Sequence, residues 1–392
     1  MKKVKLSELG EIVGGSTPAI KDIENYDGNI SWITPKDLAN YNKIFIESGE
    51  RSITEKGLKS SSTKMLPKNS VLFTSRAPIG YIAIAEKELC TNQGFKSIIP
   101  NNNVNYIFLY YLLKYNKEYI ASFGSGTTFK EVSGTVMKNI EVNIPDTIEE
   151  QKKIANILYS IDKKIELNNQ INNNLEELMK TFYQRWFIEF EFPNEEGKPY
   201  KSSGGKFVYN DELKQEIPEW WKVKKAKELT DVITGKEDAN FSTDNGKYKF
   251  FTCSNDTLKC DIPAYNGSAI LIAGNGDFNV KHYTGCFNAY QRTYVLIPEN
   301  INYYSAMYIS AKNKIDTFKK RSSGSIVKFI TKGMIEDINV IIPNDKKLLE
   351  ELNKILFAIE KNNTENDKLT DLKNFLLPLL MNGQINVDDI EI

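Results

Sequence analysis

The chain contains a single histidine, His282, and only four cysteines among its 392 residues. One histidine leaves little room for histidine-based catalysis or for a histidine-rich metal site. The cysteines are irregularly spaced, which favours reduced thiols in a cytoplasm over a disulfide framework. Cys253, Cys260, His282 and Cys286 follow no common zinc-binding pattern. We therefore expect no metal site.

An excess of charge of either sign is also missing, because 51 Lys and Arg residues balance 51 Asp and Glu residues. This balance argues against a polybasic tail, but it leaves room for a basic face that binds DNA. No run of about 18 apolar residues is present, so we expect no membrane span. The opening "MKKVKLSELG" has no apolar stretch of the kind a signal peptide needs. These features predict a cytoplasmic protein.

Catalytic motifs are missing as well. The chain has no Gly-x-x-x-x-Gly-Lys-Ser/Thr phosphate loop and no Asx-Pro-Pro-aromatic tetrapeptide of an amino-methyltransferase. "AILIAGNGDF" (Ala269–Phe278) favours a β-turn over a cofactor-binding turn, since no convincing helix or acidic strand end follows. The acidic residues of Pro145–Lys153 lie too close together for a nuclease Mg²⁺ site. We expect no catalytic residue and no cofactor bound by this chain.

What the chain does have is a long internal repeat. "GSGTTFKEVSGTVMKNIEVNIP" ends at Pro145, and "SSGSIVKFITKGMIEDINVIIP" ends 198 residues later at Pro343, with no gap between the matched positions. "SELGEIVGG" (Ser7–Gly15) similarly matches "KELTDVITG" (Lys227–Gly235). An internal repeat of this kind indicates that the same structural unit occurs twice. The chain is therefore expected to consist of two related halves.

Each half has a β-rich middle with one buried helix. Short branched and aromatic runs such as "VLFTS", "YIAIA" and "TYVLIP" are bounded by Gly, Asn and Pro, which is typical of strands. Val104–Phe123 and Asn302–Phe318 are apolar, unbroken and equivalently placed, and they predict buried helices. A further helix follows each "IP", the first opened by the capping pattern of Thr147 and Glu150. The expected class is α+β.

Apolar residues recur at threes and fours along both later helices, which predicts that these helices pair. The alternative is that each amphipathic helix lies on its own domain. Both seams become polar at the same place, and a polar residue in a seam can fix its register. The residues expected to pair the helices or to dock partners are Ile154, Leu158, Ile161, Asn168, Leu352, Leu356, Ile359 and Asn366.

The segment between the first helix and the second half is rich in Gly, Pro, Ser and charged residues, which is typical of a linker. The expected divisions are a first domain over 1–146, a helix over 147–190, a linker over 191–216, a second domain over 217–344 and a second helix over 345–392. Pro378 interrupts the second helix, and proline is a residue that can kink a helix.

Three polar loops stand out in the first half: "SRAPIG" from Ser75, "NQGFK" from Asn92 and "GSGTTFK" from Gly124. Their side chains can bind phosphate oxygens and read base edges, and Gly permits a close approach. Ordinary polar surface loops remain the alternative. The candidate DNA-binding residues in the two halves are Thr34, Lys36, Arg76, Gln93, Lys96, Ser125, Thr127, Thr128, Lys130, Ser254, Asn275, Gln291, Arg292, Ser323, Ser325 and Lys328.

Taken together, several motifs resemble those of one family. They are "WITPKDL" (Trp32–Leu38), "VLFTSRAPIG", "TNQGFKSIIP", the repeated stretch before each "IP", "IPEWWKVKKAKEL" (Ile217–Leu229) and "LLPLLMNGQI" (Leu376–Ile385). The chain resembles the specificity subunits of type I restriction–modification enzymes over essentially its whole length. It departs from the pattern in its first half, which lacks the "IPEWW" opening.

The resemblance implies two tandem target-recognition domains, each reading half of a split double-stranded DNA target, separated by two long antiparallel coiled-coil helices. It implies that two methyltransferase subunits dock on the helices and hold S-adenosylmethionine, and that restriction (motor-nuclease) subunits can join them. A helix over Glu149–Arg185 would span ~55 Å at 1.5 Å per residue. Two other functions stay open: an adaptor that binds only proteins, and a single-chain DNA methyltransferase or nuclease.

Overall fold

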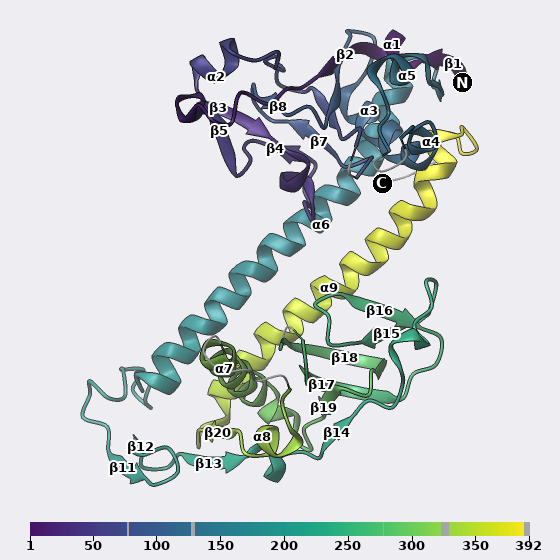
Figure 1. The fold of residues 1–392 in the computed structure, drawn as a ribbon. Helices are drawn as coiled ribbons and strands as arrows, with labels where there is room; N and C mark the ends of the chain where they lie inside the picture. Colours follow the sequence, from purple (N-terminus) through teal and green to yellow (C-terminus); the bar gives the residue numbers. More distant parts are fainter. Residues whose placement is uncertain (77, 127–129, 277, 323–328, 388–392) are drawn as a thin grey trace. The chain divides into compact units, whose positions relative to one another are not determined.

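The computed structural model describes the chain except for residues 77, 127–129, 277, 323–328 and 388–392, and for 318–322 it describes only the backbone. The chain divides into two compact units (Figure 1). The N-terminal unit contains residues 1–168 and 365–392, and the C-terminal unit contains residues 169–364. Each unit therefore combines one half of the repeat with parts of both long helices.

The N-terminal unit is built on a five-stranded sheet with the strand order β2-β9-β6-β7-β4. All its neighbouring strands are antiparallel except β4 and β7. Its central strand β6 is buried along its length, which agrees with an apolar run that does not alternate with polar residues. The strands are β2 (Gly10–Gly14), β4 (Phe45–Ile46), β6 (Val71–Phe73), β7 (Ile82–Ala85) and β9 (Lys96–Pro100).

The C-terminal unit is built on a six-stranded sheet with the order β14-β19-β17-β18-β15-β16. The only parallel neighbours in this sheet, over its described residues, are β15 and β18. The strands are β14 (Val232–Thr234), β15 (Tyr248–Phe251), β16 (Thr257–Cys260), β17 (Tyr265–Ala273), β18 (Val280–Ala289) and β19 (Thr293–Leu296).

The two sheets share one topology. The order β2-β9-β6-β7-β4 corresponds to β14-β19-β17-β18-β15, and the parallel pair occupies the same place in both. The internal repeat is thus a repeat of the fold, and the expected tandem α+β domains are confirmed. The halves differ in that the N-terminal domain adds a sheet of order β5-β3-β8. Its strands are β3 (Tyr26–Ile33), β5 (Arg51–Ile53) and β8 (Cys90–Thr91).

A helix packs on each main sheet. In the N-terminal domain, α3 (Tyr106–Tyr115) lies against β6 and β7, and α4 (Lys117–Ser122) follows it. In the C-terminal domain, α7 (Tyr304–Ser322) lies against β17 and β18. The two apolar stretches expected to be buried helices are therefore helical. The first is interrupted at Asn116, whose side-chain amide donates a hydrogen bond to the carbonyl of Leu112.

Each domain is closed by a two-stranded ribbon that precedes a long helix. β1 (Lys2–Lys5) pairs with β10 (Glu141–Ile144), and β13 (Lys222–Lys225) pairs with β20 (Asn339–Ile342). The hydrogen bond that follows each ribbon is repeated too, from the amide of Leu6 to Ile140 O and from that of Ala226 to Ile338 O. Short helical turns flank the ribbons: α1 (Leu6–Leu9), α5 (Gly134–Asn139), η4 (Ala226–Glu228) and α8 (Lys332–Glu336).

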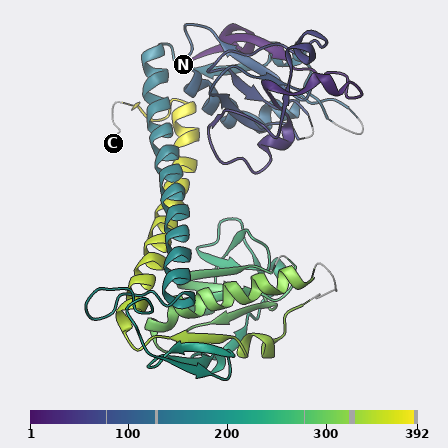
Figure 2. The ribbon, with the colours of Figure 1, turned by 90° about the vertical axis from the view of Figure 1, so that its left-hand side faces the viewer.

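The two long helices are α6 (Ile148–Tyr183) and α9 (Lys346–Met381), and α9 continues through Pro378 (Figures 1 and 2). Thr147 caps α6 by accepting a hydrogen bond from the amide of Glu150 at 3.2 Å. In the N-terminal unit, residues near the start of α6 share a core with the end of α9. In the C-terminal unit, the end of α6 shares a core with the start of α9. Within each unit the two helices therefore run antiparallel.

The segment expected to be a linker is folded into the C-terminal unit. After the π-helical turn η3 (Gln184–Ile188), a hairpin forms from β11 (Phe207–Asn210) and β12 (Gln215–Pro218). The ring of Phe192 stacks on Trp221 at a centroid distance of 4.8 Å and on Tyr200 at 4.6 Å. Gly197 and Gly204 serve turns with positive φ. The Gly and Pro content that suggested a linker thus reflects tight turns between packed aromatic residues.

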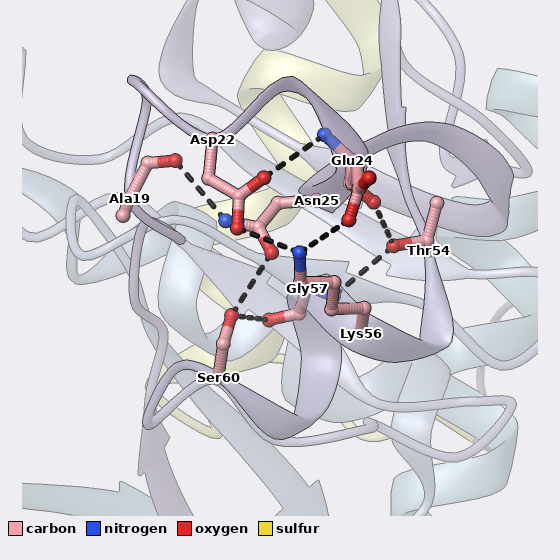
Figure 3. A network of polar contacts seen from close by, with 8 residues as sticks. All are labelled: Ala19, Asp22, Glu24, Asn25, Thr54, Lys56, Gly57 and Ser60. Atoms are coloured by element: carbon pink, nitrogen blue, oxygen red, sulfur yellow. Dashed lines mark hydrogen bonds and ion pairs between the residues drawn. The ribbon is translucent and has the colours of Figure 1, made fainter.

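A network of ion pairs and hydrogen bonds connects η1 (Ile23–Asn25) with α2 (Glu55–Lys59) in the N-terminal domain (Figure 3). The amine of Lys56, in α2, lies 2.9 Å from Asp22 and 2.5 Å from Glu24, beside η1. The buried Asn25 amide donates to the carbonyl of Ala19 at 3.1 Å. These contacts tie the loop that precedes β3 to the helix that follows β5. The remaining short turns are η2 (Pro35–Leu38), η5 (Ala239–Phe241) and η6 (Ile301–Tyr303).

Candidate nucleic-acid interface

Three loops of the N-terminal domain meet at the end of strand β6. The amide of Ser75 donates to the carbonyl of Gly94 at 2.7 Å, and the amide of Val132 donates to the carbonyl of Ser75 at 2.9 Å. We call Ser75, Gly94 and Val132 the strand-end frame of this domain. The frame joins the three polar loops that the sequence singled out, although they lie as far as 57 residues apart.

An ionic cluster stands on the N-terminal strand-end frame. Arg76 Nη1 lies 3.6 Å from Glu131 Oε2, and Lys96 Nζ lies 3.5 Å from Glu131 Oε1. Both distances are long for charge-assisted hydrogen bonds, so Glu131 does not clamp either cation tightly. Glu131 also pairs with Ser125 through two backbone hydrogen bonds, of 2.9 and 3.1 Å. Ser125 and the neighbouring Lys130 are exposed.

The remaining candidates of this domain lie beside the frame. Gln93 is exposed, and its Oε1 accepts a hydrogen bond from the Thr17 hydroxyl. Thr34 caps the turn η2, and its hydroxyl donates a hydrogen bond to Asp37 Oδ2 at 2.6 Å. The preceding residue, Ile33, accepts a hydrogen bond at its carbonyl from the amide of Asn92. Lys36 is exposed and forms an ion pair of 2.6 Å with Glu50. Lys36 is therefore less free to bind DNA than its position in the sequence indicates.

The C-terminal domain repeats the frame bond for bond. The amide of Gly274 donates to the carbonyl of Arg292 at 2.9 Å, and the amide of Ile330 donates to the carbonyl of Gly274 at 2.8 Å. Gly274, Arg292 and Ile330 form the C-terminal strand-end frame, at the end of β17. Since β17 corresponds to β6, the two domains present equivalent loops at equivalent strand ends.

The C-terminal frame borders a hollow of about 530 Å³. Three predicted DNA-binding residues line it: Asn275, Gln291 and Arg292. Gln291 Nε2 donates to Asp238 at 2.6 Å, and the Tyr294 hydroxyl donates to the carbonyl of Ile330 at 2.9 Å. The side chain of Arg292 is exposed and forms no ion pair with any described residue. The hollow is thus lined both by polar side chains that can donate hydrogen bonds and by aromatic rings.

Ser254 lies next to this frame because the Cys253 thiol approaches the carbonyl of Arg292 at 3.3 Å. Ser254 is exposed, and its carbonyl accepts a hydrogen bond from Lys281 Nζ at 2.6 Å. Burial lowers the pKa of Lys281, and the Asp256 charge partly opposes this effect. The predicted residues Thr127, Thr128, Ser323, Ser325 and Lys328 lie outside the described part of the chain.

Several residues of these sites were missed in the sequence analysis. Thr17 and Asp238 hold the two glutamines, and both closely follow the matched glycines Gly15 and Gly235. Glu131 joins Arg76 to Lys96, and at the equivalent position, 198 residues later, stands the exposed Phe329. These residues lie close to or within the repeated segments of the sequence, but only the contacts in the folded chain show which candidate side chains they bind.

The residues expected to pair the helices lie in or beside the helix contacts. Ile154, Leu158, Leu352, Leu356 and Ile359 belong to the two cores, and Ile161 is also buried. Asn168, which is buried, donates from Nδ2 to Asn366 Oδ1 at 2.9 Å and to Glu365 at 2.8 Å. Both long helices therefore carry a polar interruption between apolar contacts.

An acidic side chain with little exposure on each long helix anchors the adjoining domain, 13% exposed for Asp162 and 9% for Glu360. Asp162 accepts a hydrogen bond from Tyr111 at 2.7 Å, and Glu360, its counterpart 198 residues later, accepts one from Tyr304 at 2.6 Å. His282 Nδ1 lies 2.8 Å from Glu360. Burial by itself raises the pKa of Glu360, but the hydrogen bond and charge of His282, with the Tyr304 and Thr284 hydroxyls, outweigh it and lower the pKa.

Over the described residues, no three His, Cys, Asp or Glu side chains gather in a way that would hold a metal ion. The four cysteines, Cys90, Cys253, Cys260 and Cys286, carry free thiols. No helix in the described ranges has an apolar stretch long enough to cross a membrane. The polar loops at the two frames are therefore the main candidate sites.

Known proteins match both halves of the chain. The family described as "Type I restriction modification DNA specificity domain" matches residues 1–177 and 218–374. The MjaIX type I restriction enzyme specificity subunit of Methanocaldococcus jannaschii is 34% identical, covering 98% of this chain and 94% of its own length. The HindI specificity subunit of Haemophilus influenzae is 24% identical, over 91% of this chain and 94% of its own.

A solved structure shares the fold. The type I restriction–modification S subunit from M. genitalium superposes with a TM-score of 0.61 at 19% identity, over 97% of this chain and 95% of that one. The family resemblance indicated by the sequence motifs is thus confirmed. The two matched segments contain the two main sheets and the strand-end frames. This chain belongs to the family of type I restriction–modification DNA specificity subunits.

Proposed function

We propose that this chain is the sequence-recognition subunit of a type I restriction–modification enzyme and that each of its domains reads one half of a bipartite DNA target. The observation that carries the proposal is the repeated strand-end frame. Both frames bring Gln, Arg and small polar residues to one strand end, on loops 16 or more residues apart. Phosphate contacts position such a protein, and contacts to base edges give it specificity. Because the side chains on the two frames differ, the target is asymmetric.

In this function the loop candidates have two roles. Lys130, Ser125 and Lys96 are suited to phosphate oxygens, since lysine acts as a mobile point charge and hydroxyls donate single hydrogen bonds. Gln93 and Gln291 are suited to adenine, to which an amide can bind through two hydrogen bonds. Thr34, Lys36, Ser254 and Asn275 lie at the edges of the same surfaces. Thr127, Thr128, Ser323, Ser325 and Lys328 belong to the same loops in the sequence.

The partners that this function requires are two methyltransferase subunits, docked on the paired helices. Large apolar side chains on both helices are exposed, including Leu167, Leu178 and Phe375, which is 64% exposed. Such side chains on a helix pair provide surface for further helices. S-adenosylmethionine belongs to those subunits, and restriction subunits can join the assembly. Since the substrate is chromosomal DNA and the four thiols are free, the proposal places the chain in the cytoplasm.

The test separates this function from a self-sufficient enzyme and from a protein-only adaptor. The purified chain is incubated with duplex DNA and radiolabelled S-adenosylmethionine, alone and after assembly with co-expressed methyltransferase subunits. Methylation of one bipartite motif by the assembly, and none by the chain alone, supports the proposal. Methyl transfer or cleavage by the chain alone would indicate a single-chain enzyme. An assembly without salt-dependent DNA affinity would indicate an adaptor.

A further inference from the structure

The two strand-end frames are equivalent in backbone but carry their arginines at different corners. The residue after Ser75 of the first frame is Arg76, whereas the residue after Gly274 of the second frame is Asn275. The residue whose carbonyl accepts the first hydrogen bond of each frame, which we call the opposite corner, is Gly94 in the first frame and Arg292 in the second. By contrast, Gln93 and Gln291 stand at the same position. The frames therefore share a glutamine and differ in where a guanidinium group is placed.

Packing enforces this difference. A Cβ atom at position 94 would lie 2.8 Å from Pro35 Cγ and 3.0 Å from Asn92 Oδ1, closer than ordinary contacts. The first frame thus has no room for a side chain at the corner where the second carries Arg292. The closer constraint comes from Pro35, in the turn that follows β3, and β3 belongs to the sheet that the N-terminal domain adds.

Both guanidinium groups keep their donors available. Arg76 is about one-third exposed and lies 3.6 Å from Glu131, a distance that orients the side chain without forming a tight bidentate pair. Arg292 is exposed at the hollow, where its backbone is fixed by Gly274. A planar fork of this kind fits the O6 and N7 acceptors of guanine in the major groove, and this is the commonest specific contact of arginine.

We propose that Arg76 and Arg292 are specificity-determining residues that each read a guanine, one in each half of the target. The guanines occupy different places relative to the base contacted by the shared glutamine, because the arginines occupy opposite corners of equivalent frames. This inference rests on the proposed function and deepens it. It assigns the asymmetry of the target to two named side chains.

The experiment begins with the assembled methyltransferase complex. Its motif is mapped from methylated positions in host DNA, and duplexes are then made in which each guanine of the motif is replaced singly by 7-deazaguanine, which lacks the N7 acceptor. We expect wild-type affinity to fall about 5-fold or more at one guanine in each half-site. Arg292→Ala should bind the unmodified duplex more weakly and lose sensitivity at one of these guanines only. Arg76→Ala should lose it only at the other.

Two further variants separate base reading from charge and folding. Arg292→Lys keeps the charge but loses the fork, so it should retain the salt dependence of wild type and still fail to distinguish guanine from 7-deazaguanine. Arg185→Ala removes the same charge from the exposed turn η3 in the same unit and should leave the motif and the 7-deazaguanine response unchanged.

The possible results separate a failure of the arginine assignment from a failure of the proposed DNA-recognition function. A mapped motif that lacks guanine in either half-site overturns the arginine assignment while leaving the recognition function intact. So does an Arg292→Ala complex that keeps its 7-deazaguanine response, or a pair of variants that affect the same half-site. Full rescue by lysine would assign the arginines to phosphate contacts instead. Absence of any bipartite motif in wild type contradicts the proposed function itself.

Discussion

Asn168 donates its side-chain amide to Oδ1 of Asn366 at 2.9 Å, and the two residues are 198 positions apart, the spacing of the internal repeat. A residue of the first helix therefore contacts its own counterpart in the second. Two antiparallel helices can bring equivalent positions together at only one level. Around this level the seam is polar, since Asn172 and Asn363 also form a hydrogen bond of 2.9 Å.

Replacement of Asn168 by alanine should destabilise the chain by about 1–3 kcal/mol, because this buried side chain loses two partly buried hydrogen bonds. Urea unfolding followed by circular dichroism measures the change. The control is Asn173→Ala, an exposed position on the same helix, which should change stability by less than about 0.5 kcal/mol. Changing both Asn168 and Asn366 to leucine should restore stability but loosen the register, visible as mixed species in light scattering. A single species in that double variant would contradict the register role.

Glu360 gives the C-terminal unit a dependence on pH. Its pKa is lowered in the folded chain, so its contribution to stability is present above the unfolded glutamate pKa of about 4.3 and is lost as pH falls through the lower folded value. Thermal unfolding of wild type and Glu360→Gln should therefore differ at neutral pH and converge in acid. Glu350→Gln, on the exposed side of the same helix, should match wild type at every pH. A constant difference between wild type and Glu360→Gln would exclude the titration.

The hydrogen bond from Tyr111 to Asp162 should hold the N-terminal domain to helix α6. Tyr111→Phe keeps the buried ring and removes only the hydroxyl, so we expect a loss of about 1.5–3 kcal/mol, the range for hydrogen bonds to charged groups. Equilibrium unfolding in urea measures this. Tyr119→Phe, at an exposed ring of the neighbouring helix α4, serves as the matched control and should be near neutral. Equal stability of the two variants would show that the contact is not an anchor.

Lys130 is expected to contact the phosphate backbone without reading sequence. Lys130→Ala should weaken the binding of the assembled complex to all duplexes alike and reduce the slope of log affinity against log salt by about one unit. Lys68→Ala provides the comparison, because Lys68 is also exposed but precedes β6, at the far end of the strand from the frame. Should both variants give the wild-type slope, Lys130 is a solvated surface residue.

Much of this fold could be predicted from the linear sequence. The repeat at 198 residues predicted two equivalent domains, and apolar periodicity predicted α6 and α9, because both signals depend only on residue order and spacing. The three polar loops and both arginines were also found in this way. The linker was misread, since Gly and Pro serve packed turns as readily as flexible segments, and composition does not distinguish the two.

Which of these residues lie together depends on the packing of the folded chain. Ser75, Gly94 and Val132 meet because β9 lies beside β6, and strand order depends on hydrogen bonds between segments that are distant in sequence. The same contacts place Glu131 between Arg76 and Lys96, and they place Pro35 where it excludes a side chain at position 94. Local and periodic patterns in the sequence were thus enough to predict the repeated architecture and the family. The positions of the arginines on two equivalent frames follow from long-range packing, which no local pattern encodes.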